Sequence, residues 1–178
     1  MIDTTRSMTE QEIIEGCLQN QPIAQKELYD RYKKSMFTLA YRITGNFGDA
    51  GDVLQDAFVK VFRALPKFRR ESTIGAWIKT IVIRTAYSHL RKNKIFFEPI
   101  EEVDPGEVVD WGDYLAAEYL EKAILSLPDG YRIVFTMIEI EGYSHKEVGE
   151  KLGISVGTSK SQLFYAKRKL RKMLENIA

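Results

Sequence analysis

The chain has 178 residues, 44% of them hydrophobic, and a formal net charge of +1 at pH 7. This length suits one domain or two small ones, and the single cysteine, Cys17, excludes a disulfide framework and a thiolate zinc site. No apolar run approaches the ~20 residues that a membrane span requires. The first residues also lack the basic-then-apolar order of a signal peptide. We therefore expect a cytoplasmic protein that is not inserted in a membrane.

The small net charge conceals a strong segregation of charge along the chain. Residues 60–94 contain ten Lys/Arg and one acid, and residues 95–129 contain ten Asp/Glu and one lysine. Residues 143–178 contain eight cations and three acids. Two basic blocks around an acidic one indicate two nucleic-acid-binding surfaces with an acidic segment between them.

The N-terminal half begins with two predicted helices. Thr9 and Glu12 have the spacing of a capping box, which places a helix start directly after Thr9. Pro22 suits the first turn of the next helix, whose apolar positions continue to Ile43. The glycines of segment 45–48 then end this helix.

Two further helices are predicted before the acidic block. One runs from about Asp49 to Ala64 and is followed by a break at Pro66. The other opens at Ser72 and runs to about Lys92.

The acidic block changes the character of the chain. Residues 95–110 combine prolines, a glycine and scattered acids without a sustained period, which is typical of a flexible linker. Helical spacing returns at 114–125 and 131–141, on either side of a break at Pro128. The sequence thus predicts an all-α protein: a helical domain over 1–94, an acidic flexible linker over 95–112 and a second helical domain over 113–178.

Segment 143–172 predicts a helix-turn-helix within the second domain. Ser144 and Glu147 form another capping-box pattern, Gly153 suits a left-handed helix end, and Ser155 can cap a second, cationic helix. The alternative is a helical hairpin with a solvated basic face. In the helix-turn-helix interpretation the second helix enters the DNA major groove. Its DNA-binding candidates are Lys160, Ser161, Gln162, Phe164, Tyr165, Lys167 and Arg168.

The candidates on this helix have different expected roles. Gln162 can pair bidentately with adenine and Lys160 with guanine. Lys167 and Arg168 suit phosphate contacts, whereas Phe164 fits the core as well as it fits a DNA contact.

The middle block, 67–92, mixes cations with aromatic rings. Cations neutralise phosphates, and exposed rings stack on unpaired bases, so the block suits single-stranded DNA. Trp77 fits this site and the hydrophobic core equally well. The candidates for this surface are Arg69, Arg70, Trp77, Lys79 and Arg84.

A third candidate surface lies on the helix over 49–64. It comprises Asp49, Asp52, Gln55 and Asp56, of which Asp52 and Asp56 are four residues apart and share one helix face. A solvated acidic face and a divalent-metal site are alternatives. Neither a neighbouring histidine in the sequence nor a phosphate-binding glycine loop supports the metal site, so we expect no metal and no cofactor.

Segments 49–62, 77–84 and 127–135, followed by the helix-turn-helix, resemble the extracytoplasmic-function (ECF) sigma factors of bacterial RNA polymerase, in the sigma-70 family. The resemblance runs from about Ala24 to Leu174 apart from the linker. It implies that the acidic helix binds core polymerase, that the middle block binds and melts the minus-ten element, and that the helix-turn-helix reads the minus-thirty-five element. It also implies an anti-sigma partner.

The chain departs from the family pattern at two positions. Arg84 stands where the loop after the tryptophan helix commonly has asparagine, and Ser88 stands where aspartate is common. In the same interpretation the acidic linker occupies the positively charged RNA path of the polymerase or covers the basic faces of the free chain. An ordinary solubilising linker is the alternative.

Two other functions compete with the sigma-factor interpretation. A stand-alone helix-turn-helix transcription regulator would share the C-terminal motif and use the N-terminal helices to dimerise or to sense a signal. A nucleic-acid-processing enzyme is a weaker fit, because His89 and His145 have no paired nucleophile. We therefore expect a transcription-initiation protein that is not an enzyme and has no small-molecule substrate.

Overall fold

The computed structural model describes residues 7–92 and 117–175, and within these ranges every regular element is a helix. The N-terminal domain comprises α1 (Glu10–Leu18), α2 (Pro22–Thr44), α3 (Phe47–Ala64), the short 3-10 turn η1 (Leu65–Lys67) and α4 (Ile74–Lys92). The C-terminal domain comprises α5 (Ala117–Leu125), α6 (Asp129–Phe135), the π-helical turn η2 (Thr136–Ile140), α7 (His145–Leu152) and α8 (Val156–Glu175). The predicted all-α class with two helical domains is confirmed. The predicted linker over 95–112, with its four-acid group Glu101, Glu102, Asp104 and Glu107, lies outside the described residues.

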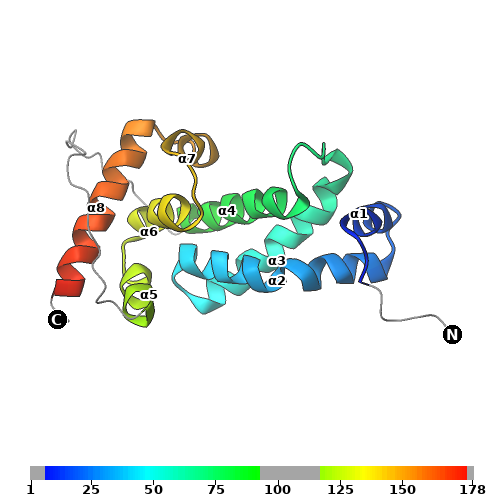
Figure 1. Cartoon of the computed structure of the whole chain (residues 1–178), viewed down its shortest axis with the longest axis horizontal. Helices are drawn as coiled ribbons and strands as arrows, with labels where there is room; N and C mark the ends of the chain where they lie inside the picture. The colour runs from blue at the N-terminus through cyan, green and yellow to red at the C-terminus, as the bar shows by residue number, and fades with distance from the viewer. Residues whose placement is uncertain (1–6, 93–116, 176–178) are drawn as a thin grey trace.

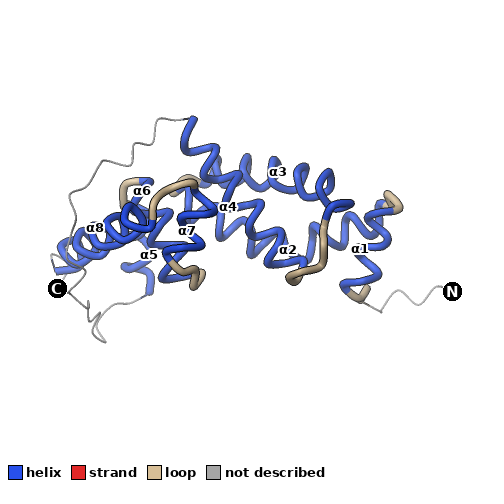
Figure 2. The backbone as a smooth tube through the Cα atoms, turned by 90° about the horizontal axis from the view of Figure 1, so that it is seen from above, coloured by secondary structure: helices blue, strands red, loops and turns tan. Residues whose placement is uncertain are grey.

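The two domains lie side by side along the long axis of the molecule, with α1 at one end and α8 at the other (Figures 1 and 2). Helices α2, α3 and α4 pack against one another, and α1 packs on the start of α2. In the C-terminal domain, α6 and α7 both pack on α8.

Local sequence signals set the helix boundaries in the N-terminal domain. The Thr9 hydroxyl accepts a hydrogen bond from the Glu12 amide at 3.2 Å, and the Glu12 carboxylate accepts one from the Thr9 amide at 2.7 Å. Gly45 ends α2 in the left-handed conformation with φ 70°. The Asn46 side chain then accepts the Asp49 amide at 2.9 Å. Because Asn46 is the N-cap, α3 begins at Phe47, two residues earlier than predicted.

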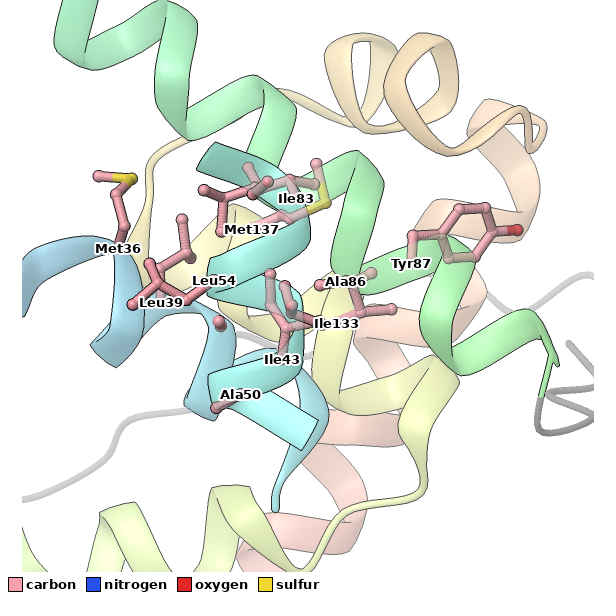
Figure 3. Close-up of a cluster of buried hydrophobic side chains, with 14 of the residues drawn as sticks. Met36, Leu39, Ile43, Ala50, Leu54, Ile83, Ala86, Tyr87, Ile133 and Met137 are labelled. Carbon is pink, nitrogen blue, oxygen red and sulfur yellow. The ribbon is translucent and has the colours of Figure 1, made fainter. Parts of the chain in front are cut away.

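One hydrophobic core extends through both domains. Ile43 of α2 and Ile83 of α4 are fully buried, as are Ile133 of α6 and Met137 of η2. Figure 3 shows these four side chains converging in a single cluster between the two domains. The domains are therefore joined by apolar packing as well as by the chain.

Cys17 occupies the buried face of α1, with 5% of its surface exposed. Burial raises the pKa of its thiol. Over the described ranges we find no helix with the length and apolar character needed to cross a membrane.

Candidate nucleic-acid interface

Helices α7 and α8 form the predicted helix-turn-helix. The Ser144 hydroxyl accepts the Glu147 amide at 3.3 Å, and the Glu147 carboxylate accepts the Ser144 amide at 2.8 Å. The Ser144 hydroxyl also donates to this carboxylate at 2.8 Å. The hydrogen bond from the Ser144 amide and then the one from its hydroxyl lower the pKa of Glu147. Gly153 ends α7 at φ 67°, and the Ser155 hydroxyl accepts the Thr158 amide at 2.9 Å. All three local predictions are confirmed.

The turn between the two helices also depends on Gly149, which the sequence analysis missed. A Cβ atom at this position would lie 2.8 Å from the carbonyl oxygen of Ile154. That approach is too close for any side chain, and the obstacle is backbone. Gly149 is therefore the residue that allows α7 to turn tightly into α8.

A hydrogen bond ties the start of α7 to the start of α8. His145 Nδ1 lies 2.9 Å from the Ser159 hydroxyl, and the imidazole is half-buried. Burial lowers the pKa of His145, and the positive charges of Lys160 and Lys167 lower it further. This contact fixes the position of α8 relative to α7.

Most of the predicted α8 candidates reach the surface. Lys160 and Arg168 are exposed, and Ser161, Phe164 and Tyr165 are partly buried. Tyr165 stacks on Tyr131 of α6, with 6.1 Å between the ring centroids.

Lys167 is held by an acid of the same domain. Its ammonium lies 2.7 Å from a carboxylate oxygen of Glu139, and both side chains remain partly exposed. A phosphate approaching Lys167 would therefore compete with Glu139.

Gln162 does not project from α8 as predicted. Its side chain is only 1% exposed, and neither its amide nitrogen nor its amide oxygen has a hydrogen-bond partner in the described part of the chain. The buried stripe of α8 includes Ser159, Gln162 and Ala166, at three- and four-residue spacing, so position 162 lies on the core side. The expectation that Gln162 faces a base is therefore wrong for this arrangement of the chain.

The candidates of the middle block come from α4 and the segment before it. Trp77 is partly buried and packs on Phe68 with 5.0 Å between the rings, so it belongs to both the core and the surface. Arg69 is exposed beside Glu71. Lys79 is ion-paired, with its ammonium 2.6 Å from a carboxylate oxygen of Glu141 in the C-terminal domain.

The family resemblance implied a loop at Arg84 and Ser88, whereas the residue pattern predicted a helix to about Lys92. The structure confirms the helix and corrects the loop. Helix α4 continues without a break from Ile74 to Lys92, and both side chains are exposed on it. The irregular segment instead precedes α4. There Arg70 adopts a left-handed backbone conformation with φ 59°. With Phe68, Thr73 and residues of α1 it lines a hollow of about 480 Å³.

The acidic surface of α3 is present. Asp52, Gln55 and Asp56 are exposed on the side opposite the buried face of the helix. Asp49 differs, because its carboxylate lies 3.1 Å from Nε2 of His89 on α4. A histidine is thus close in space although it is distant in sequence. The described residues nevertheless contain no group of three or more His, Cys, Asp or Glu side chains that could hold a metal ion.

Comparison with known families identifies both domains. The family model for sigma-70 region 2 matches residues 28–95, and the model for sigma-70 region 4 matches residues 117–170. The chain belongs to the ECF group of the sigma-70 family. Sigma factors act in promoter-specific initiation of transcription, and they are not enzymes in the catalytic sense. Because both sigma regions match, a stand-alone helix-turn-helix regulator is not favoured.

Curated relatives agree with this assignment. This sigma factor is 30% identical over 156 residues to the ECF RNA polymerase sigma factor SigE of Mycolicibacterium smegmatis, an alignment covering 83% of this chain and 60% of SigE. It is 28% identical over 166 residues to the ECF sigma factor SigW of Bacillus subtilis, covering 85% of this chain and 89% of SigW.

Two solved structures share the fold of the sigma factor. One is the sigma factor RpoE in complex with the anti-sigma factor NepR from Bartonella quintana, with a TM-score of 0.58, 24% identity, and 84% of this chain and 96% of that chain covered. The other is CnrH in complex with the cytosolic domain of CnrY, with a TM-score of 0.56, 22% identity, and 93% and 97% covered.

Proposed function

We propose that this sigma factor binds core RNA polymerase in the cytoplasm and directs it to specific promoters. In this proposal residues 1–94 bind the polymerase and the minus-ten element, residues 95–112 link the domains, and residues 113–178 read the minus-thirty-five element. The single observation that supports it best is the order of the two matched regions, region 2 followed by region 4, along one chain.

The polymerase contact is assigned to the exposed side of α3. Asp52, Gln55 and Asp56 present two carboxylates and an amide on one face, while the opposite face anchors the helix in the core. Asp49 is partly engaged by His89 and therefore contributes less to this contact.

Promoter melting is assigned to the surface around the start of α4. Unstacking a base costs a few kcal/mol, and base–aromatic stacking returns ~1–3 kcal/mol. Trp77 supplies the ring, and Arg69, Arg70, Lys79 and Arg84 supply positive charge for displaced phosphates. The other contributions come from the polymerase.

Upstream recognition is assigned to the exposed start of α8. In helix-turn-helix proteins the N-terminal residues of the second helix contact base edges. Lys160 and Ser161 occupy these positions, with Phe164 one turn later. Tyr165, Lys167 and Arg168 lie nearer the backbone of the DNA. The burial of Gln162 removes it from this set.

An anti-sigma partner belongs to the same proposal. Both structures cited above were solved with an anti-sigma protein or a partner domain, which supports a comparable partner for this chain. We assign it no small-molecule substrate.

The proposal is tested by adding the full chain to bacterial core polymerase and transcribing a library of random promoters. Initiation from a subset is expected, and the enriched sequences give both promoter elements. An Asp52→Asn/Asp56→Asn variant should lose core binding, whereas a Glu15→Gln/Glu150→Gln variant removes two exposed charges elsewhere and should keep it. Sequence-specific duplex binding without any complex with core polymerase would instead indicate a stand-alone regulator.

A further inference from the structure

His145 lies where the two helices of the helix-turn-helix meet. It is the first residue of α7, and its Nδ1 lies 2.9 Å from the hydroxyl of Ser159, which is fully buried near the start of α8. The imidazole itself is half-buried, so one edge of the ring is held between the helices while part of the ring remains open to solvent. The position of this imidazole is therefore fixed relative to both helices of the motif.

The hydrogen bond to Ser159 does not restrict His145 to one protonation state. A serine hydroxyl can donate to an unprotonated Nδ1 and can accept from a protonated one. The two nitrogens lie on different edges of the imidazole, so Nε2 points away from Ser159. A proton can therefore be added to His145 without breaking the contact that fixes α8 on α7.

Three charged side chains act on this imidazole from the elements packed around it. Burial has the largest effect and lowers the pKa of His145, Lys160 and then Lys167 of α8 lower it further, and Glu139 of η2 opposes them. Helix α4 also packs on α7, but none of its described side chains is among the charges that act on the ring. In the free chain the imidazole is therefore neutral near neutral pH.

Bound DNA would change the sign of the charge around the imidazole. In a helix-turn-helix the second helix lies in the major groove and the first helix crosses the phosphate backbone, so the joint between them lies beside phosphates. A phosphate beside Lys160 and Lys167 cancels the positive charge that disfavours an imidazolium ion, and its own negative charge favours one. DNA binding at this joint therefore raises the pKa of His145.

We propose that His145 is a DNA contact and that its imidazole takes up a proton from solvent when a backbone phosphate binds beside Lys160 and Lys167. The protonated ring presents Nε2–H to the phosphate as a charge-assisted donor, while Nδ1–H donates to Ser159. The ligand is a phosphate of duplex DNA. This inference rests on the upstream-recognition role proposed above for α8, and it adds a residue of α7 to that surface.

Proton uptake makes DNA binding tighter as the pH falls. Above the pKa of His145 in the complex, the ring is neutral with and without DNA, and the affinity is constant. Between this value and the lower pKa in the free chain, only the complex is protonated, so the affinity rises. Since one pKa unit corresponds to a tenfold change in an equilibrium constant, a rise of up to one unit gives about two- to tenfold tighter binding between about pH 8 and about pH 5.5.

The proposal is tested by binding of the full-length chain to a short duplex of mixed sequence at low and constant ionic strength. His145→Asn keeps a polar group near the position of Nδ1 to pair with Ser159, but it cannot take up a proton, so its affinity should lack the rise. His89→Asn removes the only other histidine of the chain and should keep the rise. A rise that persists in His145→Asn, or its absence in the native chain, would overturn the proposal.

Nuclear magnetic resonance of the two imidazole signals decides the question at His145 itself. The signal that is absent in His145→Asn belongs to this residue, and its titration midpoint should lie at a higher pH in the DNA-bound chain than in the free chain. An unchanged midpoint in a chain that binds the duplex would overturn this inference and leave the proposed function standing. A chain that does not bind the duplex at all would contradict the DNA-binding function and this contact together.

Discussion

At the scale of single residues, Gly45 and Arg132 depend on each other. The left-handed φ of 70° at Gly45 turns the chain away from the end of α2 and leaves its carbonyls open to the guanidinium group. A Cβ atom at position 45 would lie 2.8 Å from Cζ of Arg132. The glycine therefore serves both the backbone conformation and the access of Arg132.

We predict that Gly45→Ala lowers the free energy of unfolding by more than the ~1–2 kcal/mol expected for a left-handed backbone alone. The additional loss of unfolding free energy comes from displacement of Arg132. Gly142→Ala is the matched control, because Gly142 has φ 75° but nothing within 4 Å of its missing Cβ. Chemical denaturation measures both variants. Equal losses would show that Arg132 adapts without cost.

Gln162 gives a second prediction at this scale. Its buried amide has no hydrogen-bond partner among the described residues, and an unsatisfied buried polar group costs ~1–3 kcal/mol. Gln162→Met keeps the volume and removes both polar atoms, so it should raise the free energy of unfolding by about 1 kcal/mol. It should also leave discrimination among upstream sequences unchanged in a binding assay. Loss of discrimination among upstream sequences would mean that the Gln162 side chain leaves the core when the chain binds DNA.

At the scale of elements, the start of α7 depends on the capping box. Ser144→Ala should destabilise the C-terminal domain by about 1 kcal/mol, because it removes the acceptor for an otherwise unpaired amide. Thermal unfolding followed by circular dichroism measures this loss. Glu118→Ala, on the exposed side of α5, serves as the control and should have a smaller effect. A Ser144→Ala loss no larger than that of Glu118→Ala would argue against the cap.

Glu147, which pairs with Ser144 in the capping box, makes the start of α7 sensitive to acid. The pKa of Glu147 is lower in the folded chain than in the unfolded chain, because the carboxylate accepts hydrogen bonds from Ser144. The contribution of Glu147 to stability is present above its pKa in the unfolded chain, about 4.3. It is lost as the pH falls through the lower pKa of the folded chain. The stability difference between the native chain and Glu147→Gln should therefore shrink on acidification. A stability difference between the two chains that persists at a pH well below the pKa of Glu147 in the folded chain would contradict this assignment.

These elements also show what the sequence alone could predict. Helix starts at Thr9 and Ser144 and helix ends at Gly45 and Gly153 depend on residues within a few positions, and all were predicted correctly. The side on which Gln162 lies follows from its spacing with Ser159 and Ala166, but its polar side chain favoured a surface position. The contact of Arg132 with the end of α2 depends on another element. No local pattern reveals this contact, because Arg132 reaches carbonyls 88 and 89 positions away in the chain.

The same distinction applies to the candidate site. Exposure of Asp52, Asp56 and Lys160 follows from helical periodicity and was predicted. The pairing of Asp49 with His89 and of Lys79 with Glu141 joins segments that are distant in sequence. The family resemblance implied a loop at Arg84, whereas the residue pattern predicted a helix to about Lys92 and was correct, because neither glycine nor proline ends the helix there.

At the scale of the whole molecule, the packing of the two domains against each other is incompatible with reading both proposed promoter elements at once. Elements centred near minus ten and minus thirty-five are about 25 steps apart, or ~85 Å at 3.4 Å per step. In the structure the ammonium of Lys79 in one domain lies 2.6 Å from a carboxylate oxygen of Glu141 in the other. A chain of the length of 93–116 can span at most ~86 Å when fully extended, which is sufficient once the size of the domains is added.

We therefore predict that core polymerase separates the two packed domains. A water-soluble carbodiimide joins a carboxylate to an amine in direct contact, so it should cross-link Lys79 to Glu141 in the free chain. In the presence of core enzyme without DNA, this cross-link should fall severalfold, because the domains separate. The Lys167–Glu139 cross-link should remain, because both residues belong to the C-terminal domain. Mass spectrometry of the digested complex measures the two yields. An unchanged Lys79–Glu141 yield would show that the polymerase binds the chain with its two domains still packed together.

The buried position of Cys17 makes the chain well suited to labelling with pairs of fluorophores. Its thiol is 5% exposed and has a raised pKa, so it reacts slowly with maleimides near neutral pH. Cysteines introduced at exposed positions, one in each domain, would accept dyes while the native thiol stays unmodified. The movement of the domains could then be followed in single molecules without first replacing Cys17.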